Sequence, residues 1–356
     1  MTGRERLKRA IHFQSPDRVP VSFKDVFPLF HIPPQSWQPE EPYYPYVHPL
    51  IIKSRLWKPE RKLPRGWLEQ TRIAIDEWGT IWRISSISTQ GEVVKGALEE
   101  SWDLLEDFKP PDFSDWSRFK TFARLSKILA GNRYRLAVND NSLWERFRFL
   151  RGFENAMMDL IQHPAETRRL LEILTDCHLQ IVENFKKAGA EGFMLLDDWG
   201  TQERTFISPG LFEKFFAPCY QRIVERCHEL GMDCGIHSCG NIRLIVPALI
   251  EIGFDFLQLD SPNMCGIDWL RENAGGKIAL FCSPDIQEVY IKNDPELLRA
   301  HIKEQILKLA DFNGGFVGWP YSEWRVIGVK DEIHKLAISL YLEYGRYPLN
   351  KEKLLI

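Results

Sequence analysis

The sequence has no uninterrupted apolar run of the roughly 18 residues that a membrane-spanning helix needs. Its amino-terminal stretch, MTGRERLKRAIHFQSPDRVPV, is basic and helical in pattern, and it lacks the apolar core of a secretory signal. No excess of one charge is present either, because 46 Lys and Arg stand against 49 Asp and Glu, for a formal net charge of −3. We therefore expect a cytoplasmic protein that binds neither membranes nor nucleic acid.

The chain also lacks the signs of a disulfide framework, an internal repeat or a low-complexity segment. Seven cysteines, an odd number, occur without an export signal, which favours reduced thiols, some of which could be metal ligands. The length of 356 residues suits one α/β barrel, and 44% hydrophobic residues suffice for its core. We expect a single domain over residues 1–356.

Short apolar runs alternate with longer amphipathic segments over most of the chain, as in repeated βα units. The runs are nearly continuous, which is typical of parallel strands buried on both faces. Two candidate strands, RVPVSF (18–23) and WGTIWRI (78–84), come first, and six more follow: YRLAVND (134–140), GFMLLDDW (192–199), DCGIHSCG (233–240), FDFLQLDSP (254–262), KIALFCSPD (277–285) and GGFVGWPY (314–321). Eight such units predict an α/β fold, a TIM (β/α)8 barrel with an amino-terminal helical and Pro/Trp-rich extension.

Several helix boundaries and one irregular segment can also be predicted. Ser208 and Pro209 mark the start of a helix, and Pro218 inside the same pattern predicts a kink. Asp294 marks the start of another helix. The stretch 33–67 is rich in Pro, Tyr and Trp without periodicity, and we expect it to lie over one mouth of the barrel.

The stretch GIHSCGN places His237 and Cys239 two positions apart at the end of a predicted strand. Residues two apart in a strand point to the same face, so an imidazole nitrogen and a sulfur can meet on one zinc ion. The alternative is structural, because cysteine is often a small buried hydrophobe. A catalytic zinc needs a third protein ligand, and Cys282, at the end of another predicted strand, is the candidate.

Four stretches together resemble the uroporphyrinogen decarboxylase superfamily over nearly the whole chain: RERLKRAIHFQSPDRVPV, SLWERFRFLRGFENAMMDL, LLDDWGTQERTFISPGLFEKFFAPCYQRI and HSCGNI. The resemblance implies a TIM barrel. It also implies one of two activities, since the superfamily contains decarboxylases and zinc-dependent methyltransferases that work with corrinoid proteins.

The decarboxylase branch carries an arginine-containing segment after the first strand, where the carboxylates of its substrate are paired. This sequence has no arginine between Arg18 and Arg55, and only Lys24 and His31 could supply positive charge there. The histidine that the family has after its last strand is absent from GGFVGWPYSEW. Decarboxylation of uroporphyrinogen is therefore not expected.

The methyltransferase branch has an H-x-C zinc pair, which His237 and Cys239 match. Its third ligand is a cysteine on the last strand, where this sequence has WPY and no cysteine. We take Cys282 as the substitute, with Glu323 or an acidic residue such as Asp198 as the fallback. The expected function is zinc-dependent transfer of a methyl group between a small methylated substrate or thiol and a corrinoid.

The resemblance leaves the direction of transfer open. Zinc could hold a substrate thiol as thiolate, or act as a Lewis acid on a leaving group. No corrinoid-binding region is visible in the sequence, so the corrinoid (cobalamin) would be carried by a partner protein. A homodimer is compatible with the family.

Two neighbouring acids end the predicted strand GFMLLDDW, and alternation directs only one of them into the barrel. Asp198 matches the acidic position of the superfamily, and we expect it to be catalytic, although an Asp at such a place can also cap a helix. Around it we expect a substrate pocket formed by residues near the ends of several strands: Asn139, Trp144, Gln202, Trp319 and Tyr321.

Two other functions remain open at the level of sequence. One is a decarboxylase of a smaller acidic substrate, using Asp198 and Lys24 without a metal. The other is a non-catalytic ligand-binding barrel. Metal content separates the methyltransferase from both.

Overall fold

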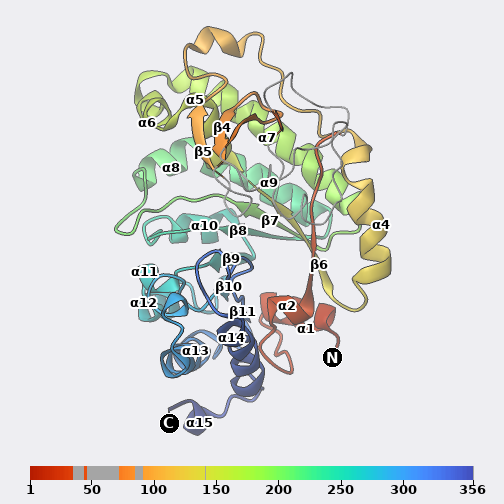
Figure 1. Cartoon of the computed structure of the whole chain (residues 1–356), viewed down its shortest axis with the longest axis vertical. Coiled ribbons are helices and arrows are strands. Elements are labelled where there is room, and N and C mark those ends of the chain that lie inside the picture. The colour runs from red at the N-terminus through yellow and green to blue at the C-terminus, as the bar shows by residue number, and fades with distance from the viewer. Residues whose placement is uncertain (35–43, 46–71, 85–90, 141, 356) are drawn as a thin grey trace.

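A curled sheet of parallel strands forms the centre of the protein (Figure 1). The computed structural model describes residues 1–34, 44–45, 72–84, 91–140 and 142–355. Within these residues the sheet has seven strands in the order β1-β6-β7-β8-β9-β10-β11. Their bounds are β1 Val26–Leu29, β6 Tyr134–Asn139, β7 Gly192–Leu196, β8 Asp233–His237, β9 Phe256–Leu259, β10 Ala279–Cys282 and β11 Phe316–Gly318. A parallel bridge between Val21 and Gly318 joins the last strand to the segment before the first. The fold is an α/β barrel of the TIM type.

Helices cover the outside of this sheet and connect its strands (Figure 1). The α-helices are α1 Gly3–Ile11, α2 Ser22–Asp25, α4 Lys120–Leu129, α5 Leu143–Arg151, α6 Phe153–Gln162, α7 Pro164–Lys187, α8 Pro209–Phe215, α9 Ala217–Glu229, α10 Val246–Ile252, α11 Pro262–Cys265, α12 Ile267–Asn273, α13 Pro295–Leu309, α14 Asp331–Tyr344 and α15 Lys351–Leu355. Short 3-10 helices lie at Trp102–Leu105, Trp116–Arg118 and Tyr290–Lys292. No helix in the described ranges is long and apolar enough to cross a membrane.

A second sheet lies outside the barrel, in the order β2-β3-β4-β5. Its strands are β2 Tyr44–Pro45, β3 Arg72–Ile75, β4 Ile81–Ile84 and β5 Glu92–Lys95. The side chain of Arg146 from α5 donates to Asp76 Oδ2 at 2.7 Å, in a buried ion pair. This pair attaches the second sheet to the helical layer of the barrel.

The predicted strand 78–84 belongs to this second sheet and not to the barrel, so that prediction is wrong. Asp76 Oδ1 accepts the backbone N–H groups of Trp78 and Thr80 at 3.0 and 2.9 Å, and the resulting turn folds β4 back antiparallel on β3. A strand that follows so tight a turn pairs with the strand before it rather than with a barrel strand.

The first barrel strand also differs from the prediction, since it is β1 and not 18–23. Residues Ser22–Asp25 form one turn of helix, α2, before the strand begins. The cause is Asp25, which is buried and accepts the N–H of Val21 at 2.8 Å and a hydrogen bond from Arg18 Nη1 at 2.8 Å. These bonds bend the chain, and only Val21 keeps a bridge to the sheet.

The remaining strand and helix predictions are confirmed. Each of the six apolar runs from residue 134 onward contains one barrel strand. Ser208 caps α8 by accepting the N–H of Leu211, and the helical run breaks at Phe216, just before Pro218. Asp294 caps α13. The irregular stretch 33–67 lies outside the described residues, apart from Pro33, Pro34 and β2.

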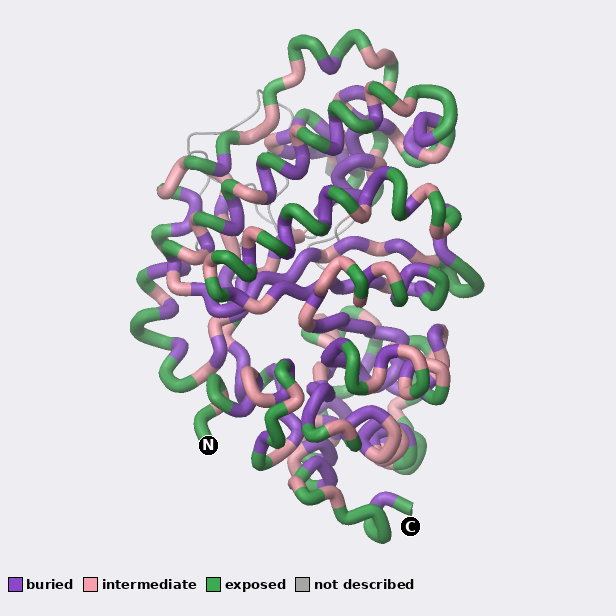
Figure 2. Tube along the Cα trace, turned by 180° about the vertical axis from the view of Figure 1, so that it is seen from behind, coloured by how far each residue is buried: buried purple, intermediate pink, exposed green. Residues whose placement is uncertain are grey.

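The core has two layers. In Figure 2 the buried segments, coloured purple, run through the middle of the molecule. One layer lies between the sheet and the surrounding helices. The other fills the inside of the barrel, with side chains from alternate positions of the strands and from α1: Leu7, Ala10, Ile11, Val26, Tyr134, Leu136, Met194, Phe256, Ala279, Phe281 and Val317. Helix α1 therefore closes the amino-terminal end of the barrel, which leaves the carboxyl ends of the strands as the end for a site.

Candidate metal site at the carboxyl end of the barrel

Alternation along β7 and β8 directs three side chains into the same end of the barrel. Met194 and Leu196 pack in the inner layer, so Asp198, two residues further, continues the inward face. His237 ends β8, next to β7 in the sheet, and Cys239 follows it by two residues. All three side chains thus come from adjacent strand ends.

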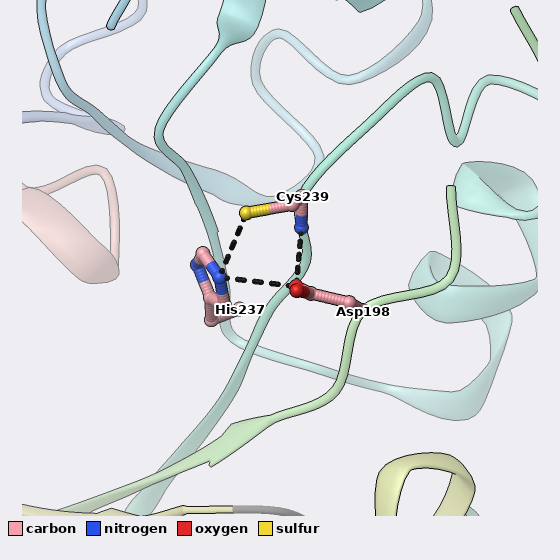
Figure 3. A group of neighbouring side chains, drawn as sticks. All are labelled: Asp198, His237 and Cys239. Carbon is pink, nitrogen blue, oxygen red and sulfur yellow. Dashed lines mark hydrogen bonds and ion pairs between the residues drawn. The ribbon is translucent and has the colours of Figure 1, made fainter. Parts of the chain in front are cut away.

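The three side chains converge (Figure 3). His237 Nε2 lies 3.4 Å from Cys239 Sγ and 3.3 Å from Asp198 Oδ1. The backbone N–H of Cys239 donates to Asp198 Oδ1 at 2.8 Å. One ligand atom from each residue lies within 4.8 Å of the others.

The three side chains shift one another's pKa values. Burial alone would lower the pKa of His237, but Cys239 and Asp198 raise it well above its usual value. Burial would also raise the pKa of Asp198, yet its hydrogen bond with His237 and the backbone N–H of Cys239 lower it to about 2. Burial raises the pKa of the Cys239 thiol to about 11, with His237 acting in the opposite direction. These shifts favour the protonated form of His237, whose Nε2 lies between the other two groups.

The donor atoms fit a zinc ion. Bond lengths of about 2.0–2.1 Å to nitrogen, about 2.3 Å to sulfur and about 2.1 Å to oxygen imply tetrahedral edges of about 3.5 Å for N–S and about 3.4 Å for N–O. The distances of 3.4 and 3.3 Å from His237 Nε2 are close to both. Zinc would replace the proton at this place, since metal binding requires neutral imidazole and thiolate.

Gln258 and Asp260, which sequence reasoning did not connect to His237, support it from β9. Gln258 Oε1 accepts a hydrogen bond from His237 Nδ1, and Gln258 Nε2 donates to Asp260 Oδ1 at 2.9 Å. Because Asp260 accepts, the amide presents its oxygen to the imidazole, which holds the Nδ1–H tautomer and leaves Nε2 free for a metal. The sequence feature that could have indicated this role of Gln258 is its amide at an inward position of the apolar run FDFLQLD.

The neighbouring acid, Asp197, has the structural role that was the alternative for Asp198. It is fully buried and faces the helical layer, where it accepts the N–H groups of Trp144 and Glu145 at 3.0 and 2.7 Å. Tyr220 also donates its hydroxyl to Asp197. Asp197 caps α5, and Asp198 is the acid that reaches the site.

Cys282 does not join the group, which corrects the expected third ligand. On β10, Phe281 points into the barrel and Cys282 packs in the layer between sheet and helices. It is fully buried, and burial raises the pKa of its thiol far above the usual range. Asp198, the fallback, is the residue that lies beside His237 and Cys239. Glu323 is absent from the metal-ligating groups found among the described residues.

Two expected substrate residues lie away from the barrel opening. Trp144 is completely buried and stacks on Trp199, with ring centroids 5.1 Å apart. Asn139 is 3% exposed and lies in hydrogen-bond contact with His31 Nε2 at 3.3 Å. Asn139 ends β6 on the outward face that it shares with Ala137, and Trp144 lies on α5 and packs in the layer between the sheet and the helices.

The other three lie nearer the opening. Trp319 is partly exposed and stacks on Phe281, with centroids 5.4 Å apart, on the inner side of the barrel. Tyr321 is partly exposed, and burial together with Asp260 and Cys239 raises its pKa to about 12. Gln202 is exposed on a loop and donates to Gln287 at 3.2 Å.

A described cavity of about 470 Å³ lies elsewhere, against the second sheet. Its walls come from residues 75–79 and 97–109, and none of the expected site residues lines it. A substrate pocket beside His237 therefore stays a prediction.

Comparisons with known proteins agree with this architecture. The solved structure of a methyltransferase from Methanosarcina mazei superposes with a TM-score of 0.66 at 13% identity, covering 97% of this chain and 99% of that one. A D-psicose 3-epimerase solved in the presence of D-fructose superposes with a TM-score of only 0.42 at 13% identity, over 63% of this chain and 82% of that one. No curated protein matches the sequence.

The methanogen protein shares the fold. At 13% identity, this likeness is limited to the fold. The family assignment comes from the sequence, because the model of the uroporphyrinogen decarboxylase (URO-D) family matches residues 90–317, more than half of the chain. This chain belongs to the uroporphyrinogen decarboxylase (URO-D) family.

Proposed function

We propose that this protein is a zinc-dependent methyltransferase that moves a methyl group between a small methylated substrate or thiol and a corrinoid on a partner protein. The observation that carries the proposal is the convergence of Asp198, His237 and Cys239, with Gln258 holding the imidazole so that Nε2 faces the other two. The likeness in fold to the methanogen methyltransferase supports the same class.

Asp198, His237 and Cys239 would hold the zinc. Three protein ligands leave one coordination position for substrate, and zinc there supplies the Lewis acidity that ionises a thiol or polarises a leaving group at neutral pH. The chain's own residues do the rest. Gln258 orients the imidazole, and Trp319, which packs against the inner layer of the barrel, would shield the reacting methyl group from water.

Tyr321 would act on the substrate itself. Its raised pKa keeps the phenol protonated at neutral pH, so its hydroxyl can donate a hydrogen bond to a substrate oxygen or sulfur. Burial raises the pKa of Tyr321 most, and the charges of Asp260 and Cys239 add to this shift.

The decarboxylase alternative loses its proposed pair of residues. Lys24 precedes the amino end of β1, whereas Asp198 follows the carboxyl end of β7. Because β1, β6 and β7 run parallel, the two side chains lie at opposite ends of the barrel and cannot act on one substrate. Arg18, the last arginine before β1 in the sequence, is already paired with Asp25 at the amino-terminal end of the barrel.

Elemental analysis of the purified protein tests the metal. We expect the zinc content to fall by one ion per chain in Cys239→Ser and in Asp198→Ala but to stay unchanged in Cys282→Ala, because Cys282 packs behind the sheet. Retention in Asp198→Ala with loss in Cys282→Ala would reverse the ligand assignment. A native protein without metal would contradict the proposal.

Methyl transfer is tested with methylcobalamin and a small thiol, followed by the absorbance change of the corrinoid. The methyl group leaves cobalt for sulfur, the corrinoid keeps the bonding electron pair, and the thiol gives up its proton. We expect transfer by the native protein to fall by at least about 100-fold in His237→Ala. Equal rates in the two proteins would exclude catalysis at this site.

A further inference from the structure

A second group of ligand-type side chains lies at the opposite, amino-terminal end of the barrel. Asp233 begins β8, Asp255 immediately precedes β9, and His12 is the residue that caps the carboxyl end of α1. One ligand atom from each of these residues lies within 4.8 Å of the others. The three positions belong to neighbouring strands and to the helix that closes this end of the barrel.

Both carboxylates also accept hydrogen bonds from groups other than His12. Asp233 Oδ2 accepts the Tyr134 hydroxyl at 2.6 Å, and Asp255 Oδ2 accepts the N–H of Cys234 at 2.7 Å. His228 Nε2, from α9, adds a contact of 2.8 Å to the same oxygen of Asp255. Partners of this kind orient carboxylate ligands around a metal.

The ionisable groups at this end include two carboxylates and two imidazoles. The side chains of Asp233 and Asp255 are only 13% and 19% exposed, so the two negative charges are poorly solvated. Within the described ranges, their ion-pair partners are the imidazoles of His12 and His228, with no lysine or arginine on either carboxylate. Glu191 nearby differs, because Arg4 and Arg135 both pair with it.

A single dication would neutralise both carboxylates while leaving the imidazole neutral and able to coordinate. His12 Nε2 already lies 2.9 Å from Asp233 Oδ1, so a nitrogen and an oxygen donor face one another. Mixed imidazole and carboxylate donors suit a divalent first-row metal, and the absence of sulfur from this group distinguishes it from the Cys239 site.

We propose that His12, Asp233 and Asp255 form a second metal site, for a divalent transition metal such as zinc, which fastens α1 to β8 and β9. This site does not depend on the proposed function. Bound metal would hold the helix whose Leu7, Ala10 and Ile11 fill the inside of the barrel, so its effect is on stability.

Zinc binding by a chain whose Asp198, His237 and Cys239 site has been removed tests the proposal. In His237→Ala/Cys239→Ala, stripped of metal with chelator, calorimetric titration should find one zinc per chain with a Kd of about 1 µM or tighter. Zinc should also raise Tm by a few degrees. His12→Gln in this background should weaken binding by at least about 100-fold, since a ligand is lost.

His163→Gln, an exposed histidine outside the group, is the matched control and should leave the affinity unchanged. If the double variant does not fold, the native chain should bind two zinc ions and His12→Gln one. A Kd weaker than about 1 mM in the double variant, or equal affinity after His12→Gln, would overturn the second site.

Discussion

Gln258 is an amide inside a strand whose other inward positions are apolar or acidic. It is 3% exposed, and its hydrogen bonds to His237 and Asp260 use both ends of the amide. A buried polar group of this kind is costly unless its partners are present, so the three residues act as one unit.

Replacing Gln258 with Leu should therefore weaken zinc binding by about 10–100-fold, because the imidazole loses its orientation while the ligand set stays intact. Competition with a zinc chelator gives the affinity. Gln287→Leu, at an exposed position, should leave it unchanged. If Gln258→Leu bound zinc with the native affinity, Gln258 would not be a positioning residue for His237.

The adjacent acids Asp197 and Asp198 should show opposite effects. Asp197→Ala leaves two backbone donors and the Tyr220 hydroxyl buried without an acceptor, and should cost about 3 kcal/mol of unfolding free energy. Asp198→Ala should lower zinc affinity with little loss of stability, since its side chain is 41% exposed. Denaturant unfolding of both variants measures the difference, and equal destabilisation would contradict the separation of roles.

Among the helices, α7 contains an uncharged buried histidine. His178 is 2% exposed, its Nδ1 donates to the carbonyl of Leu174, and its Nε2 has no hydrogen-bond partner among the described residues. Burial lowers its pKa to about 4. Between pH 4 and an ordinary value of about 6.5, the unfolded chain binds this proton and the folded chain does not, so stability is complete above about pH 6.5 and falls as the pH decreases.

His178→Phe should remove this acid sensitivity. From pH 7 to pH 5 the native chain should lose about 2 kcal/mol more unfolding free energy than the variant, because one proton is taken up on unfolding. Urea unfolding at several pH values gives both curves. Parallel curves would mean that His178 is already protonated in the folded protein.

For the molecule as a whole, closure of the barrel depends on the seam between the segment before β1 and β11. Gly318 N–H donates to the carbonyl of Pro20 at 2.9 Å, and the bridge to Val21 lies beside it. A Cβ at Gly318 would lie 2.7 Å from Cγ of Tyr341, a fully buried ring. The seam therefore has no space for a side chain.

Gly318→Ala should cost about 1–3 kcal/mol of unfolding free energy through overpacking against Tyr341. Gly210→Ala in α8 has no atom within 4 Å of the added Cβ and should be neutral or slightly stabilising. Chemical denaturation compares the two variants. A neutral Gly318→Ala would show that the seam can adjust.

The features that could be predicted from the sequence depend on local rules. The period of two along a strand directs His237 and Cys239 to one face and separates Asp198 from Asp197. Capping side chains and Pro218 mark where helices begin and break. Continuous apolar runs indicate buried parallel strands, and these rules sufficed for the six strands from residue 134 onward and for the barrel.

The errors arise where side-chain contacts choose between alternatives that the apolar pattern leaves open. In ALFC both faces of β10 are apolar, so no pattern could show that Cys282 faces the helices. WGTIWRI alternates equally well in a barrel or a hairpin, and the Asp76 turn selects the hairpin. The first strand moved because Arg6 and Arg18 converge on Asp25 across the fold. Alternation orders side chains within one strand, but only packing between strands and helices determines which face is inside and which residues meet there.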